Sequence, residues 1–379
     1  MKIFVFGSSL TSTYWNGAAT YYRGIYKNLH RLGHEITFAE PDIYDRQSRQ
    51  DAPNPDYARG RVYETPREIP ELLREGERCD VVIKHSGVGA EDALLEHQVL
   101  RCQSPCTRVV FWDVDAPATL ARLNADPNDP FHALIPAYDA ILTYGGGDPV
   151  LEQYRRLGAR NCRAVYNGLD PDTHYAVPED ENFGCDLLFV GHRLPDRERR
   201  VEEYFLKAAL LAPELSFVLG GEGWGGKDLP NNVRWIGHVS SEMHNLVNCS
   251  ARMVLNVNRD SMAQTGFSPP TRIFEAAGAG ACVITDLWNG VDQFFTPGAE
   301  ILTASSAQDV VNHLRRVDNR RAQEIGSAMK RRALHDHSYA SRAVEVDRLF
   351  VDMAAGSILS PSMVAKQDAL ESKSGENAS

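Results

Sequence analysis

The stretch from residue 266 to residue 301, GFSPPTRIFEAAGAGACVITDLWNGVDQFFTPGAEI, carries the clearest fold signal in this sequence. Ser268 and the two prolines after it end one element, and a helix is expected from Thr271 to Ala277. A Gly-Ala-Gly break follows, and Cys282 to Thr285 then reads as a buried strand that ends at Asp286. Together they indicate one αβ unit of a parallel sheet.

Two residues of this expected helix indicate a binding site for a nucleotide diphosphate. Arg272 and Glu275 are three residues apart and therefore share one helix face. The first turn of the helix, with Ser268 and Thr271 at its start, offers free N–H groups and the positive end of the dipole to phosphates. Arg272 would also contact the phosphates, and Glu275 would accept hydrogen bonds from ribose hydroxyls. An ordinary αβ unit with a surface ion pair explains the same pattern, so both interpretations stay open.

The stretch resembles the donor-binding part of glycosyltransferases with the GT-B fold, in particular the family related to the spore-maturation protein CgeB. The residues that carry the resemblance are Ser268-Pro269, Arg272, Phe274-Glu275-Ala276, Gly280, Phe295, Pro297-Gly298 and Glu300. In the broader GT-B group the matching Glu closes a Glu-x7-Glu pair, but Phe267 stands eight residues before Glu275 here. The missing carboxylate fits the CgeB-like branch, and no role of that first Glu carries over.

Length and charge exclude several classes of protein. A chain of 379 residues suits two domains. The net charge of −11 argues against nucleic-acid binding, which needs a clustered basic face. No apolar run approaches the ~20 residues of a membrane span, and the N-terminal MKIFVFG runs into a strand without a cleavable signal. No transmembrane segment is therefore expected.

The cysteines predict a cytoplasmic protein without a metal site. Seven cysteines, an odd number, are scattered from Cys79 to Cys282, which indicates reduced thiols. Cys102 and Cys106 lack the His or second Cys pair that would complete a zinc site. Asp113-Val114-Asp115 spells the D-x-D that holds a divalent cation in GT-A glycosyltransferases. Three-residue patterns often arise by chance, and we interpret this one as coincidental; no cofactor is predicted.

Strands and helices alternate twice along the chain, which predicts an α/β protein with two parallel, doubly wound sheets. The strands are expected at 2–7, 35–39, 81–85, 108–112, 140–143 and 163–166, and again at 186–190, 216–219, 233–236, 253–257 and 282–285. The predicted parts are an N-terminal domain (1–167), a linker rich in Pro, Asp and Glu (168–184), a C-terminal domain (185–338), a last helix (339–353) and a disordered tail (354–379). The resemblance implies two Rossmann-like domains facing across a cleft, with the acceptor on the first, the nucleotide-sugar on the second, and the last helix crossing back to the first.

Further donor-site candidates stand at the carboxyl ends of second-half strands, where open α/β sheets bind ligands. Gly191 directly follows a strand and lets a phosphate approach the backbone, and Arg193 or Arg197 would supply a planar fork of donors. A solvated charge run is the competing explanation for these arginines. Asn258 ends another strand and is a weaker candidate. His238 lies in a Gly-His-Val turn that in the resembling family lies near the nucleotide base, although such turns also simply join elements.

The first half offers candidates for a general base and for acceptor binding. His85 and Asp113 stand at the ends of two expected strands, and either could accept a proton from an acceptor hydroxyl. A carboxylate at this position more often caps a helix. The loop after the first strand lacks G-x-G-x-x-G, so NAD binding is not expected. Its end, Asn16-Gly17, resembles the acceptor-side glycine loop of GT-B enzymes.

These observations favour a metal-independent glycosyltransferase, a hexosyltransferase by expectation. It would move a sugar from a nucleotide diphosphate sugar, with a UDP-sugar as first choice, to a hydroxyl of a sugar, glycan or peptide. One alternative is a nucleotide-sugar epimerase of the same fold, which needs further acidic residues in the cleft. Another is a non-catalytic partner that binds sugar nucleotides, which the missing first Glu favours. Donor sugar, base, acceptor, stereochemistry and oligomeric state stay open.

Overall fold

The structure of this chain is a computed structural model in which residues 1–14, 16 and 18–356 are described. The predicted acceptor residue Gly17 lies outside the described residues. Residues 357–379, most of the tail that was expected to be disordered, also lie outside them. Two compact units are present, one of Met1–Tyr166 with the chain from Ala340 onward, and one of Asn167–Tyr339. In the described ranges no helix is both long and apolar enough to cross a membrane.

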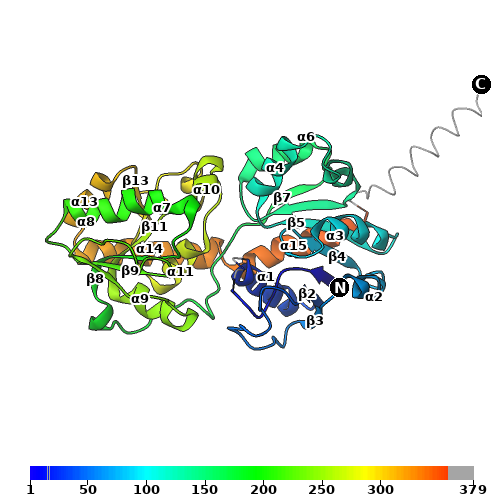
Figure 1. Cartoon of the computed structure of the whole chain (residues 1–379), viewed down its shortest axis with the longest axis horizontal. Helices are drawn as coiled ribbons and strands as arrows, with labels where there is room; N and C mark the ends of the chain where they lie inside the picture. Colours follow the sequence, from blue (N-terminus) through cyan, green and yellow to red (C-terminus); the bar gives the residue numbers. More distant parts are fainter. Residues whose placement is uncertain (15, 17, 357–379) are drawn as a thin grey trace, which may run out of the picture. The chain divides into compact units, whose positions relative to one another are not determined.

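In its described residues the first unit contains a parallel sheet of seven strands, in the order β3-β2-β1-β4-β5-β6-β7 (Figure 1). The strands are β1 (Lys2–Phe6), β2 (Glu35–Pro41), β3 (Arg59–Tyr63), β4 (Val81–His85), β5 (Arg108–Asp113), β6 (Ala140–Thr143) and β7 (Cys162–Ala164). The central strands are runs of apolar residues buried on both faces, as expected where helices cover both sides.

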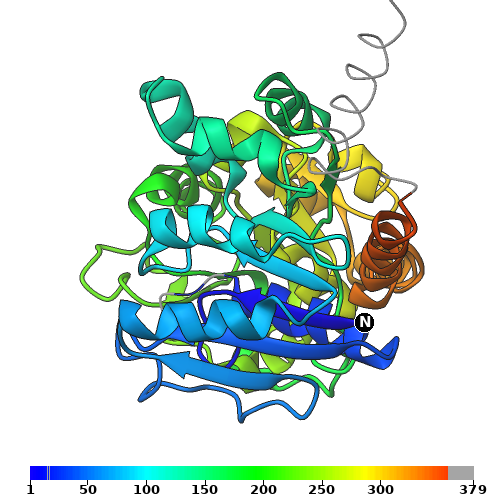
Figure 2. The same ribbon diagram turned by 90° about the vertical axis from the view of Figure 1, so that its right-hand side faces the viewer.

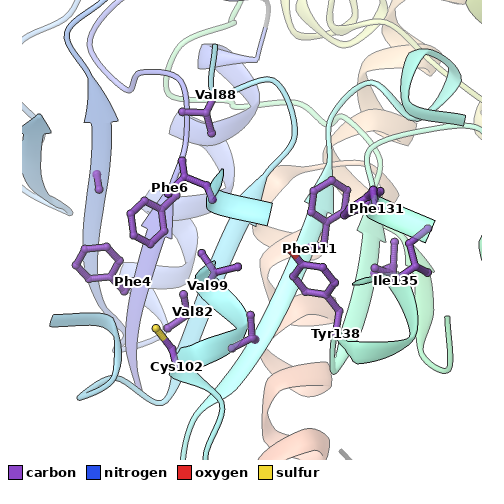
Figure 3. Close-up of a cluster of buried hydrophobic side chains, with 14 of the residues drawn as sticks. Phe4, Phe6, Val82, Val88, Val99, Cys102, Phe111, Phe131, Ile135 and Tyr138 are labelled. Atoms are coloured by element: carbon purple, nitrogen blue, oxygen red, sulfur yellow. The ribbon is translucent and has the colours of Figure 1, made fainter. Parts of the chain in front are cut away.

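Helices pack against this sheet (Figure 2). They are α1 (Ala19–Arg31), α2 (Ile69–Gly76), α3 (Asp92–Gln98), α4 (Ala116–Ala125), α5 (Phe131–Leu134), α6 (Gly147–Arg156) and α15 (Tyr339–Ala354). Phe111 of β5 meets the rings of Phe131 and Tyr138, with centroids 4.6 and 5.5 Å apart (Figure 3). Each such buried ring contributes about 2–3 kcal/mol. The helix α15 is tied to this unit by Asp347, whose Oδ1 lies 2.9 Å from Nε2 of His34.

The second unit, whose backbone is described throughout, has a parallel sheet of six strands in the order β10-β9-β8-β11-β12-β13. Its strands are β8 (Cys185–Val190), β9 (Phe217–Gly220), β10 (Val233–Trp235), β11 (Ala251–Asn256), β12 (Val283–Asp286) and β13 (Leu302–Ala304). Its helices are α7 (Pro195–Val201), α8 (Lys207–Leu211), α9 (His244–Ser250), α10 (Asp260–Thr265), α11 (Thr271–Ala279), α12 (Val291–Phe294), α13 (Ala307–Arg316) and α14 (Asn319–Asp336). Both units are therefore parallel α/β, as predicted.

Helix α11 runs two residues further than expected. It starts after Pro270, whose ψ of 156° is extended, and continues through Gly278 to end at Gly280, which has the left-handed φ of 82°. Only a glycine adopts that conformation without strain, so Gly280 ends the helix and Gly278 does not. The chain then enters β12 one residue later than predicted, and Asp286 is the last residue of the strand.

Two strands were not predicted. β3 (Arg59–Tyr63) lies at the edge of the sheet, and Tyr63 is its one buried residue. A strand that buries so little carries no apolar pattern by which it could be predicted. β13 (Leu302–Ala304) has only three residues, too few to show a periodicity. Segment 168–184 packs on the second unit, where the Leu169 N–H donates to the His337 carbonyl at 2.7 Å.

Candidate functional site

Two arginines of the second unit converge on Gly191, directly after β8. A Cβ atom at Gly191 would lie 2.8 Å from Nη2 of Arg197 and 2.9 Å from Nη2 of Arg272. Both guanidinium groups also lie over the ring of Phe189, at 5.7 and 5.2 Å from its centroid. One side chain comes from α7 and the other from α11, so the fold brings together two positive charges that are far apart in sequence.

Neutral oxygens hold these arginines in place. Nε of Arg272 donates to the Val190 carbonyl at 2.6 Å and Nη1 donates to Oδ1 of Asn256 at 3.0 Å. Nη2 of Arg197 donates to the His192 carbonyl at 2.6 Å, while its Nε is buried without a hydrogen-bond partner among the described residues.

Burial shifts the pKa of both guanidinium groups. Burial, with the neighbouring charge of Arg272, lowers the pKa of Arg197 to about 9. Burial also lowers the pKa of Arg272, although Glu275 and Asp286 act in the opposite direction. Two desolvated cations held by neutral acceptors make an environment that favours a bound anion.

Glu275 lies one helical turn beyond Arg272 and is also partly buried. Its Oε2 is 3.5 Å from Nδ1 of His244, and 14% of its side chain is exposed. Burial alone would raise the pKa of this carboxyl, but the hydrogen bond from His244 and the charges of His174 and Arg272 lower it to about 2. The group is therefore a carboxylate at neutral pH, able to accept hydrogen bonds.

The chain before α11 has an unusual backbone. Gly266 and Phe267 both have positive φ, 72° and 48°, and the second is a strained conformation for a residue with a side chain. The Phe267 ring lies against Gly290, where a Cβ would come within 2.2 Å of it. Ser268 is buried and its hydroxyl donates to the Gly266 carbonyl at 3.0 Å. Thr271 is the first residue of the helix and is partly buried.

A glycine-rich loop packs over Gly191. A Cβ at Gly221, which has φ 115°, would lie 2.4 Å from the Gly191 carbonyl oxygen. Nε1 of the buried Trp224 donates to that same oxygen at 2.8 Å. His238 lies in the turn that follows β10, and its ring is nearly parallel to that of His192, with an angle of 10° and centroids 6.4 Å apart. The predicted donor residues Gly191 and His238 are thus neighbours through His192.

Asn258 and Arg193 differ in how they relate to this cluster. Asn258 is buried, its backbone N–H donates to Oδ1 of Asp286 at 3.2 Å, and its Nδ2 lacks a partner among the described residues. Arg193 is 36% exposed and pairs with Glu198 at 2.7 Å, in a surface network that includes Lys227. Of the two arginines proposed as alternatives, the structure brings Arg197 to Gly191 and leaves Arg193 in the charge run.

The two predicted bases of the first unit are buried. His85 is 1% exposed, and its Nε2 is 2.5 Å from the hydroxyl of Tyr26. Burial lowers its pKa to about 3, so the ring is neutral. Asp113 is fully buried and accepts hydrogen bonds from Ser86 at 2.7 Å and Tyr154 at 2.5 Å. These contacts suit a role in shaping the ends of β4 and β5.

Asn16 holds together the loop that follows β1. Its Oδ1 accepts from the Ser8 hydroxyl at 2.8 Å, and its Nδ2 donates to the carbonyls of Ser9 and Ser12 at 2.9 Å each. The residue is 7% exposed, so its side chain contributes to loop shape. Its predicted partner Gly17 lies outside the described residues.

Sequence reasoning missed His174, His244 and Asn256. A lone histidine or asparagine carries no spacing signal, and each of these reaches the site only through tertiary packing. In the part of the chain that is described, no group of three or more His, Cys, Asp or Glu side chains could hold a metal ion.

Comparison with known proteins gives one family match, in the second half of the chain. A family model described as "Glycosyl transferase-like" matches residues 197–348, which include Arg197, Arg272 and Glu275. No curated protein matches the chain.

Several solved structures share the fold over nearly the whole chain. Sucrose-phosphate synthase from Thermosynechococcus elongatus is 14% identical with a TM-score of 0.67, over 94% of this chain and 100% of that one. HepE of Anabaena, in complex with UDP-glucose, is 12% identical with a TM-score of 0.65, over 93% and 100%. An alpha-glucosyltransferase in complex with UDP-glucose and DNA is 13% identical with a TM-score of 0.68, over 93% and 99%. The chain therefore has the GT-B fold of these glycosyltransferases.

Proposed function

We propose that this protein is a glycosyltransferase that uses a nucleotide diphosphate sugar, and that its second unit binds this donor. The observation that carries the proposal is the convergence of Arg197 and Arg272 on Gly191, where neutral oxygens hold both guanidinium groups. The hydrogen-bond acceptors of both guanidinium groups are neutral, and a bound diphosphate would balance their positive charge. The match of residues 197–348 to a glycosyltransferase-like family supports the same reading.

The proposed donor contacts follow the order of groups in a nucleotide. The diphosphate would lie against Gly191 and the first turn of α11, where backbone N–H groups and the helix dipole favour an anion. Ser268 shapes that turn, and Thr271 begins it. The ribose would meet Glu275, one turn further along, and the base would lie near His238. Asn258, whose Nδ2 has no partner among the described residues, would donate to the donor's sugar or phosphate groups.

Positive charge on these arginines would also assist the chemical step. Transfer of the sugar leaves a nucleoside diphosphate, and preorganised guanidinium groups stabilise the charge that develops on the leaving oxygen. Two guanidinium groups can take this role without a metal ion, so we propose a metal-independent reaction. His85 and Asp113 are buried and hydrogen-bonded, and we now propose that they position the strand ends of the first unit.

The donor sugar, the acceptor site, the family branch and the cellular location are each proposed from a separate observation. HepE and the alpha-glucosyltransferase are solved with UDP-glucose, so a UDP-hexose is the first donor to test. We propose that the first unit holds the acceptor hydroxyl, with the Asn16 loop nearby. The CgeB-related branch rests on the motif around Glu275. A cytoplasmic location rests on seven cysteines that are all unpaired in the structure.

The test is to mix the purified chain with UDP-, GDP-, ADP- and TDP-sugars and acceptor mixtures, and to measure released nucleoside diphosphate with and without EDTA. The proposal expects turnover with at least one donor, unchanged by EDTA. Arg197→Ala and Arg272→Ala should each abolish most of it, whereas Arg315→Ala, at an exposed pair with Glu214, should not. If no nucleotide sugar turns over and none raises the melting temperature, the proposed function is wrong.

A further inference from the structure

The carboxylate of Glu275 has a histidine partner on a neighbouring helix. Nδ1 of His244, the first residue of α9, is 3.5 Å from Oε2 of Glu275 on α11. Both side chains keep some exposure, 25% for His244 and 14% for Glu275. The pair therefore lies at the edge of the core, where a ligand can still reach the carboxylate.

A second histidine stands behind this pair. His174 is 7% exposed, its ring centroid is 6.5 Å from that of His244, and its Nδ1 has no partner among the described residues. The backbone of His174 packs tightly against α11: a Cβ atom added at Gly278 of this helix would lie only 2.4 Å from the His174 carbonyl oxygen. Asn245 fixes the residues on both sides: its Nδ2 donates to the Thr173 carbonyl at 2.9 Å, and its Oδ1 accepts from the Tyr175 N–H at 3.3 Å.

The charges in this cluster favour a protonated His244. Burial works against the charged ring, but the hydrogen bond and charge of Glu275 raise the pKa of His244 above its ordinary value, and the backbone of Val239 acts in the same direction. Arg272 opposes it. Burial lowers the pKa of His174, against the charges of Glu275 and Asp170. The charge and hydrogen bond of Glu275 thus favour the imidazolium form of His244 beside the Glu275 carboxylate.

We propose that His244, supported by His174, is a positioning residue that fixes the Glu275 carboxylate for the two hydroxyls of a nucleotide ribose. This inference rests on the proposed function, since it concerns the same donor. A glutamate side chain has several rotatable bonds, and ordering it costs conformational entropy. A partner that orders it before the ligand arrives removes this cost from binding. Through Val239, His244 also connects Glu275 to the turn that holds His238.

The experiment compares ribose and deoxyribose ligands. UDP and 2′-deoxy-UDP are titrated by calorimetry into wild type, His244→Ala, His244→Gln and Glu275→Ala; if the donor panel selects GDP or ADP, the ribo and deoxy forms of that nucleotide are used. We expect wild type to prefer the ribose form about tenfold, which equals about 1.4 kcal/mol. His244→Ala and Glu275→Ala should lose most of this preference, and His244→Gln should keep part of it because an amide still donates to the carboxylate.

A pH series and a matched control separate positioning from a structural role. The ribose preference of wild type should fall as pH rises through the raised pKa of His244, because the ion pair is lost, and His244→Gln should show no such fall. His335→Ala, which removes another histidine–carboxylate pair, at Asp336 and 85% exposed, should behave as wild type. If wild type binds no nucleotide, the proposed function fails. If wild type discriminates and folded His244→Ala discriminates equally well, this inference alone is wrong.

Discussion

Nη1 of Arg272 donates a hydrogen bond to Oδ1 of Asn256 at 3.0 Å, so the carboxyl end of β11 sets the direction of a guanidinium group carried by α11. Nδ2 of Asn256 donates in turn to Oγ1 of Thr285 on β12 at 3.0 Å. Two adjacent strands thus hold the arginine rigidly before any ligand binds. A group held in this way stabilises developing charge without reorganisation.

Removing Arg272 should affect turnover more than folding. We expect Arg272→Ala to lower kcat/KM by about 100-fold, as for other single charge-stabilising donors. Arg272→Lys should recover little, because a lysine cannot make the forked contacts to Val190 and Asn256. Steady-state kinetics and thermal melts check this. A fall in activity that simply follows the fraction of unfolded protein would contradict the prediction.

Gly191→Ala should fold and yet bind nucleotide poorly. The new Cβ would come within 3 Å of Nη2 of Arg197 and Nη2 of Arg272, so it would force both guanidinium groups out of their hydrogen-bonded positions. Because these atoms are the far ends of long side chains, we expect the backbone to keep its fold at a moderate cost in stability. Displacement of the guanidinium groups should weaken UDP binding at least about tenfold, or 1.4 kcal/mol. Gly226→Ala is the matched control, since a Cβ there meets nothing within 4 Å. Equal dissociation constants for the two variants would disprove the placement of the phosphates.

Glu275 should make stability depend on acid pH. Its carboxyl pKa falls from an ordinary 4.5 to about 2, so the charged form stabilises the fold above pH 4.5 and this stabilisation is lost as pH falls towards 2. The effect at neutral pH is about 2–3 kcal/mol. Glu275→Gln should therefore unfold at lower denaturant than wild type at pH 7, and the difference should shrink below pH 4.5 and disappear only as pH falls to about 2. A gap that does not change with pH would count against this pairing.

Glu275→Ala gives a complementary test of binding. We expect it to weaken the affinity for the nucleotide sugar while the protein stays folded, because the side chain keeps some exposure and lies at the edge of the core. Calorimetry with the active donor measures the change. A dissociation constant equal to that of wild type would show that this carboxylate does not touch the ligand.

His85 should make the first unit sensitive to mild acid. Burial holds its pKa at about 3 against an ordinary 6.5, so the unfolded chain binds a proton first, and stability falls as pH drops from 6.5 towards 3. The loss could reach about 4 kcal/mol. His85→Gln keeps a partner for Tyr26 but does not titrate in this range, and should flatten the profile. Denaturant unfolding at pH 7, 6, 5 and 4 checks this; parallel profiles for both proteins would refute it.

How much the sequence predicts depends on how local the signal is. The buried strands β4 and β6 have the predicted bounds, because apolar runs between turn residues are a local pattern. The edge strand β3 was not predicted, because an edge strand buries few side chains and therefore shows no run of apolar residues. Arg272 and Glu275 could be placed on one helix face from their spacing alone. The choice between Arg193 and Arg197 could not be made, because both lie in one charged run.

By itself the sequence determined that two parallel α/β sheets form and that α11 carries an arginine and a carboxylate on one face, since periodicity and helix geometry act over a few residues. Only the tertiary structure decided that Arg197 meets Arg272 beside Gly191 and that His244 meets Glu275. These pairs join separate elements, and their contacts depend on strand order and helix packing, which no spacing along the chain encodes.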